Sequence, residues 1–95
     1  MAAVTGCVTK SISPNLGKKM FLLVTPATAD SNDSVDVSSA TATGGETLSS
    51  VDFVVAWDQA TGDIVTATVS GTTITIDAAG GTSNHPYALL VAGDA

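Results

Sequence analysis

Two residues of this chain could support nucleophilic catalysis, the single histidine His85 and the single cysteine Cys7. An imidazole activates a hydroxyl or thiol when a third group orients it. His85 instead precedes Pro86 in a turn-like segment, and the sequence holds no Gly-x-Ser-x-Gly turn. Cys7 stands among apolar residues, which is typical of a packed thiol. We therefore expect an exposed turn histidine, a buried cysteine, no catalytic residues and no enzyme activity.

Oxygen ligands for a cation are suggested by Asp30, Asn32 and Ser34, which have the spacing that opens a calcium-binding loop. The sixth position of such a loop needs glycine and is Val35, and the twelfth needs a bidentate glutamate and is Thr41. One histidine and one cysteine cannot complete a tetrahedral zinc site. These residues predict an ordinary polar turn, with no metal and no cofactor. A calcium- or carbohydrate-binding β module stays open as a less favoured alternative.

The distribution of charge restricts the partners of the protein. The net charge is −6, from nine acidic residues and three lysines, and arginine is absent. Phosphate backbones would be repelled, so we expect no nucleic-acid binding. No apolar run approaches the roughly 20 residues of a membrane span, so we expect no membrane partner either. Lys10, Lys18 and Lys19 all lie in the first twenty residues, which contain no acid. This basic segment is the predicted contact with an acidic neighbour, although lysines also protect edge strands from aggregation.

The elements that must position these residues are strands, because apolar residues alternate with polar ones over much of the chain. Ile74 and Ile76 alternate with threonine in residues 72–78, and residues 64–69 alternate in the same way. The link Ser70-Gly71 between these two runs is typical of a tight hairpin. Val51, Phe53, Val55 and Trp57 share one face of the preceding run. Residues 50–78 are thus predicted to form a three-stranded antiparallel meander.

The remaining segments are less regular. Residues 3–12 are expected to form a strand with Val4, Val8 and Ile12 pointing inward. Residues 20–24 and 87–92 are apolar on both faces, which indicates central strands covered on both sides or buried against a partner chain. Residues 25–49 are expected to form a long exposed loop with one short strand around residues 35–37.

Seven short strands in 95 residues predict a single all-β domain over residues 1–95, either a small antiparallel β-sandwich or a partly open β-barrel. A domain of this size without a disulfide has little core, so association with other chains would add burial. We therefore expect a homo-oligomer. Trp57 is a candidate for its interface, because tryptophan dominates binding hot spots, although a core position is the better expectation. The apolar run before residue 25 is too short for a secretion signal, so synthesis in the cytoplasm is expected.

Three stretches carry a resemblance to a known class of proteins: residues 3–12, residues 21–30 and residues 87–93. Their short strands, rich in threonine, glycine and alanine, resemble small virion proteins encoded beside the major capsid proteins of tailed bacteriophages. The resemblance implies a capsid decoration, or cement, protein on the exterior of the virion capsid. Such proteins are often trimers that bind the major capsid protein and stabilise the shell by bridging its subunits, so a trimer is the favoured oligomer. Another virion component, such as a tail-tube, neck or fibre-attached module, is the alternative.

Overall fold

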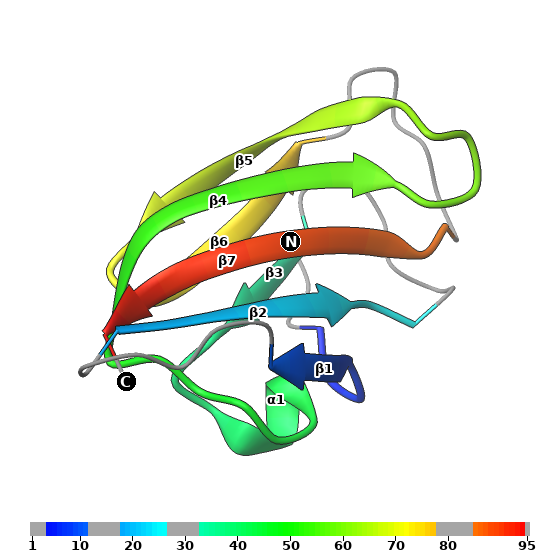
Figure 1. Cartoon of the computed structure of the whole chain (residues 1–95). Helices are drawn as coiled ribbons and strands as arrows, with labels where there is room; N and C mark the ends of the chain where they lie inside the picture. Colours follow the sequence, from blue (N-terminus) through cyan, green and yellow to red (C-terminus); the bar gives the residue numbers. More distant parts are fainter. Residues whose placement is uncertain (1–3, 12–17, 27–32, 78–84, 95) are drawn as a thin grey trace.

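The strands form one antiparallel sheet that curls into a half-barrel (Figure 1). The computed structural model describes residues 4–11, 18–26, 33–77 and 85–94. Within them the 7-stranded sheet has the order β1-β2-β7-β4-β5-β6-β3. The strands are β1 (Val8–Ser11), β2 (Lys18–Val24), β3 (Ser34–Asp36), β4 (Ser50–Asp58), β5 (Ile64–Ser70), β6 (Thr73–Asp77) and β7 (Tyr87–Asp94), and the single short helix in the described residues is α1 (Ala40–Thr43). The all-β architecture predicted from the sequence is confirmed.

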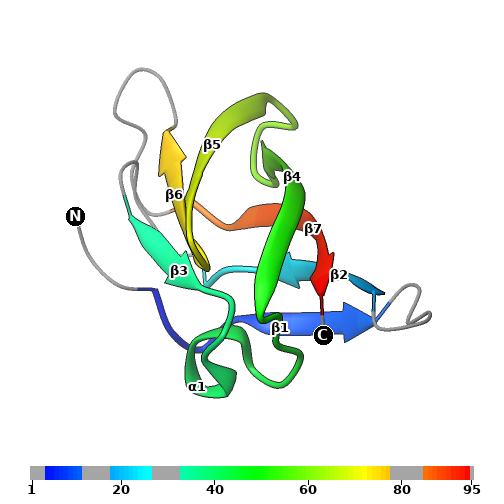
Figure 2. The ribbon, with the colours of Figure 1, turned by 90° about the vertical axis from the view of Figure 1, so that its left-hand side faces the viewer.

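The curl of the sheet arises at β5, which changes partners along its length. Only Ile64 and Val65 pair with β4, whereas residues 66–70 pair with β6. Beyond Val65, β5 therefore leaves β4 and turns behind it. The result is a front layer of β1, β2, β7 and β4 and a back layer of β5, β6 and β3, which the two views show on opposite sides of the molecule (Figure 2).

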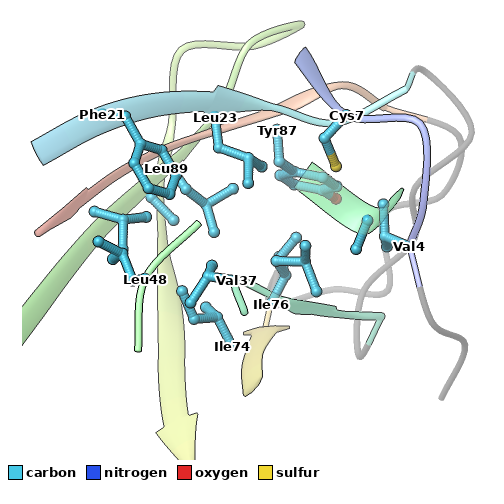
Figure 3. Close-up of a cluster of buried hydrophobic side chains, with 14 residues drawn as sticks. Val4, Cys7, Phe21, Leu23, Val37, Leu48, Ile74, Ile76, Tyr87 and Leu89 are labelled. Carbon is cyan, nitrogen blue, oxygen red and sulfur yellow. The ribbon is translucent and has the colours of Figure 1, made fainter. Parts of the chain in front are cut away.

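The hydrophobic core fills the space between these layers (Figure 3). Strands β2 and β7 of the front layer supply the fully buried side chains of Phe21, Leu23, Leu89 and Val91. Ile74 and Ile76 reach the same core from β6, as their alternation with threonine predicts. Side chains at every second position of a strand share a face, so the inward residues of β2 and β7 leave another apolar set on the opposite side.

The predicted meander is confirmed, since β4 pairs with β5 and β5 with β6, all antiparallel. The face of β4 was expected to hold Val51 together with Phe53, and here the structure differs. A bulge at Asp52 shifts the register against β7 between Val51 and Phe53. An extra residue in one strand reverses the direction of the side chains beyond it. Val51 therefore packs against the core, while Phe53 and Val55 lie on the outside.

The expectation of a long exposed loop over residues 25–49 is wrong for residues 33–49, the longer of the two parts of this range that the structure describes. Val35, Val37 and Leu48 are all buried in the core. The short strand expected here exists as β3, and α1 follows it with Ser39 as its N-cap. The apolar residues of this segment are separated by serine, threonine and aspartate, so no hydrophobic run announces that they are buried. Residues 27–32 lie outside the described part of the chain.

The expected inward face of residues 3–12 is also corrected. Val4 and Cys7 are buried, but Val8 is 68% exposed. Gly6, which lies between Val4 and Cys7, has a φ of 73°, and this left-handed conformation breaks the strand alternation. The alternation of inward and outward side chains therefore changes at Gly6, so that Cys7 points inward and Val8 outward. Ile12 and the turn expected at residues 14–17 lie outside the described residues.

Candidate interaction face

The outside of the front layer is covered by apolar side chains from neighbouring strands. Residues directly opposite each other on antiparallel strands point to the same face, so the strand registers identify the set. We call it the outer apolar face, and its members are Val8 of β1, Met20, Leu22 and Val24 of β2, Ala88, Leu90 and Ala92 of β7, Phe53, Val55 and Trp57 of β4, and Ile64 of β5. One of its rows crosses five strands, from Val8 through Val24, Ala88 and Trp57 to Ile64.

Solvent reaches much of this face. Ile64 is 74% exposed, and Phe53 and Val55 are each 44% exposed. Ala88 and Ala92 are buried because larger side chains surround them on the strands to either side. A scattered apolar residue at a protein surface is ordinary, but a contiguous apolar patch usually marks an interaction site. The outer apolar face is such a patch.

Charged residues border this face but do not interrupt its described rows. Lys10 is exposed on β1 and lies opposite Leu22, which places it at the outer edge of the face. Asp94, at the end of β7, accepts a hydrogen bond from the Ser50 hydroxyl at 2.9 Å. Most other described acids belong to loops or to the back layer, as do Asp36 and Asp77. The face is therefore close to neutral on a strongly acidic molecule.

Of the three lysines predicted as one basic contact, the structure describes the side chains of Lys10 and Lys19. Lys19 lies opposite Gly93, on the other side of the sheet from Lys10. Its Nζ is 2.9 Å from Oε2 of Glu46 and donates a hydrogen bond to the Thr47 carbonyl. Lys19 is thus engaged within the chain, while Lys10 remains at the margin of the outer apolar face. The side chain of Lys18 lies outside the described part of the structure.

For Trp57 the sequence predicted a core position, with an interface position as the alternative. The structure places it half-buried on the outer apolar face, between Ala88 of β7 and Ile64 of β5. Ala56, the next residue back along β4, is the one that enters the core. Trp57 therefore belongs to the surface that a partner would cover.

His85 was expected to be an exposed turn residue, and this is corrected, because it is half-buried and paired with Asp58. Its Nδ1 lies 2.7 Å from Oδ2 of Asp58, whose side chain is only 5% exposed. This hydrogen bond is the main reason why the pKa of Asp58 is lowered, and the backbone N–H of Ala60 adds to the effect against the opposing cost of desolvation. The pair fastens the β4–β5 turn to the start of β7. The imidazole and carboxylate are therefore used to hold the fold together.

The other groups considered for chemistry are also placed in the structure. Cys7 is buried, and its burial raises the pKa of the thiol to about 11, so it is protonated at neutral pH. Asp36 accepts hydrogen bonds from the backbone and hydroxyl of Ser38 and from the hydroxyl of Thr72. Among the described residues, no group of three histidine, cysteine or acidic side chains could hold a metal ion. Asp30 and Asn32 of the expected polar turn lie outside those residues.

Comparison with known proteins finds no matching family model, no similar curated protein and no similar solved structure. None of the helices in the described part of the chain is long and apolar enough to cross a membrane. The function must therefore be argued from the surface of this molecule.

Sequence reasoning identified part of the outer apolar face and missed the rest. The apolar residues 20–24 and 87–92 indicated correctly that β2 and β7 carry apolar side chains on both faces of the sheet. Val8 and Phe53 were missed because a positive φ at Gly6 and a bulge at Asp52 decide which way they point. A glycine next to Cys7 and an aspartate within an apolar strand are weak signals of these irregularities.

Proposed function

We propose that this protein is a non-enzymatic structural component of a virion, a capsid decoration protein that stabilises the shell through protein–protein contact. The observation that carries the proposal is the outer apolar face, which leaves Phe53, Val55 and Ile64 exposed to water on a small domain. Covering such a face is favourable by roughly 25 cal/mol for each Å² of apolar surface removed from water. A protein that stabilises a shell through an apolar protein–protein interface needs no reactive group.

The charge of the molecule supports a protein as the partner class. The net charge is −6, and Lys10 brings a positive charge to the edge of the face. Nucleic acid and anionic lipid are both repelled by such a molecule. The interior of a protein interface, in contrast, is depleted of charge and enriched in aromatic residues. Phe53 and Trp57 fit that composition.

The groups that could perform chemistry support the non-enzymatic part of the proposal. The Cys7 thiol is buried and protonated, and the His85 imidazole is tied to Asp58. The likeness of residues 3–12, 21–30 and 87–93 to small virion proteins of tailed bacteriophages directs the proposal toward the capsid exterior. On the capsid, the surfaces that cover the outer apolar face come from the major capsid protein and from further copies of the chain. Many weak contacts made at once raise the barrier to disruption of the shell.

The direct test is addition of the purified protein to expanded, undecorated phage heads, followed by co-sedimentation and calorimetry. The proposal predicts binding and a raised melting temperature of the heads. Val55→Asp places a carboxylate in the outer apolar face and should abolish both effects. Thr68→Asp adds the same charge at an exposed position of β5 in the back layer and should preserve them. Heads that neither bind the wild-type protein nor gain stability would refute the role.

The abundance of the chain in a purified particle separates this role from other virion roles. A decoration protein is present in hundreds of copies on the outside of the head. A neck or fibre-attached module is present in a few to a few dozen copies. Quantitative mass spectrometry of the particle gives this number, and a low copy number would replace the decoration role with one of those modules.

A further inference from the structure

We propose that the outer apolar face is covered by a second copy of this chain, so that the protein forms a two-fold symmetric dimer in which the front layers pack face to face. This inference rests on the proposed function and names the partner of the face: a second copy covers it, and the dimer, in place of the trimer that the resemblance implies, is the unit that binds the shell. In a two-fold dimer each copy contributes the same surface, so that surface must be complementary to itself.

The charge distribution is the first argument for a second copy. Two molecules that each carry −6 repel each other when they meet through acidic surfaces. Asp33, Asp36 and Asp77 belong to the back layer or to the segment leading into it, and Glu46 follows α1. The described front layer brings two acids to one end of the outer apolar face, Asp94 at the far end of β7 and the exposed Asp52 in the bulge of β4, and none to its centre. This face therefore allows two copies to approach with little like-charge repulsion.

The second argument is the size of the face. The row from Val8 to Ile64 crosses five strands, which at about 4.8 Å between neighbouring strands spans roughly 19 Å. From Ala88 to Ala92 the face extends roughly 13 Å along β7, and the side chains at the margins widen both dimensions. The rectangle that these two lengths enclose is roughly 250 Å², and side chains that extend about 4 Å beyond each margin raise it to roughly 500 Å² for each copy. A pair then buries roughly 1,000 Å², which is the lower limit for a specific interface. The size fits a reversible dimer of small subunits.

The third argument is the pattern of β2 and β7. Strands with apolar side chains on both faces normally lie between two packed layers. Phe21 and Leu89 meet the back layer of the same chain, while Leu22 and Leu90 point away from it. A second front layer, packed at the usual distance of about 10 Å between sheets, would cover them. Trp57 and Phe53, on the adjacent strand, then become buried anchors of the contact.

Sedimentation velocity over a range of protein concentrations tests the inference, with the single tryptophan as a local reporter. We expect the wild type to convert from monomer to dimer as its concentration rises. Quenching of Trp57 fluorescence by iodide should fall over the same range, because the dimer shields the face. Val55→Asp should raise the dissociation constant at least about tenfold, since it buries an unpaired carboxylate. Thr68→Asp should behave like the wild type.

Several results would overturn the inference. A wild type that stays monomeric at every concentration, forms a trimer, or dimerises with unchanged Trp57 quenching would contradict it. If circular dichroism shows that Val55→Asp does not fold, Ile64→Asp replaces it, because Ile64 is 74% exposed and adds little to the stability of the monomer. A dimer that fails to bind phage heads would refute the decoration role alone. A monomer that binds heads would refute the dimer alone.

Discussion

Leu89 and Leu90 are adjacent on β7, and the structure gives them opposite surroundings. Leu89 is fully buried between the layers, whereas Leu90 is half-buried on the outer apolar face. Replacing a fully buried leucine with alanine costs about 2–5 kcal/mol, from lost apolar burial and from the cavity left behind. We expect Leu89→Ala to lower the free energy of unfolding by about 3 kcal/mol and the melting temperature by roughly 12–24 °C for a domain of this size. Leu90→Ala should cost about 1 kcal/mol or less.

Urea unfolding followed by circular dichroism measures both variants, at concentrations low enough to keep the protein monomeric. The comparison is well controlled, because the two residues have the same side chain and are adjacent on the same strand. The sequence Ala88-Leu89-Leu90-Val91 does not itself show which leucine is inside. Equal losses, or a larger loss for Leu90→Ala, would refute the assignment of β7 side chains to the inner and outer faces, and with it the outer apolar face.

Three further predictions concern pH, thiol reactivity and backbone conformation. Hydrogen bonds lower the pKa of Asp36 and Asp58, so these carboxylates should stabilise the fold fully above the ordinary aspartate pKa of about 3.9, and this stabilisation should be lost as the pH falls through the lowered pKa values. In urea titrations at several pH values, Asp58→Asn should therefore reduce the dependence of the unfolding free energy on pH. Asp77→Asn removes an exposed carboxylate and serves as the charge control. The buried Cys7 thiol, with a pKa raised to about 11, should resist a thiol-reactive disulfide in the native protein at mildly alkaline pH and react at once in urea, and rapid native reaction would contradict its burial. Gly44→Ala should lower the free energy of unfolding by more than about 3 kcal/mol, because residue 44 has a φ of 86° and a Cβ there would collide with the Cys7 carbonyl. Gly62 has a similar φ of 82° but open space around it, so Gly62→Ala should lower it by only about 1 kcal/mol. Equal losses would show that the collision does not occur.

The parts of the fold that could be predicted from the sequence are those with a regular period. The alternation around Ile74 and Ile76, with a glycine turn before it, identified the hairpin of β5 and β6 and the inner face of β6. The uninterrupted apolar segments identified β2 and β7 as central strands. In each case the pattern depends only on neighbouring residues, so the sequence contains it directly.

The parts that could not be predicted depend on single backbone irregularities or on isolated contacts. The bulge at Asp52 turns Phe53 outward, and the positive φ at Gly6 does the same for Val8. Val37 and Leu48 are buried in the core, and a backbone hydrogen bond of 2.8 Å joins them across α1; local composition does not encode that contact. The pairing of His85 with Asp58 connects residues far apart in the chain, so the spacing of the sequence gave no sign of it.

The central claim is that the working form of this protein has its outer apolar face covered by protein. Hydroxyl-radical footprinting with mass spectrometry measures this directly, since it compares the oxidation of Met20, Phe53 and Trp57 in dilute protein and in the purified particle. The account predicts strong protection of all three in the particle, with His85, which lies outside the face, as the internal reference for radical dose. Equal oxidation of the three side chains in both states would contradict the claim.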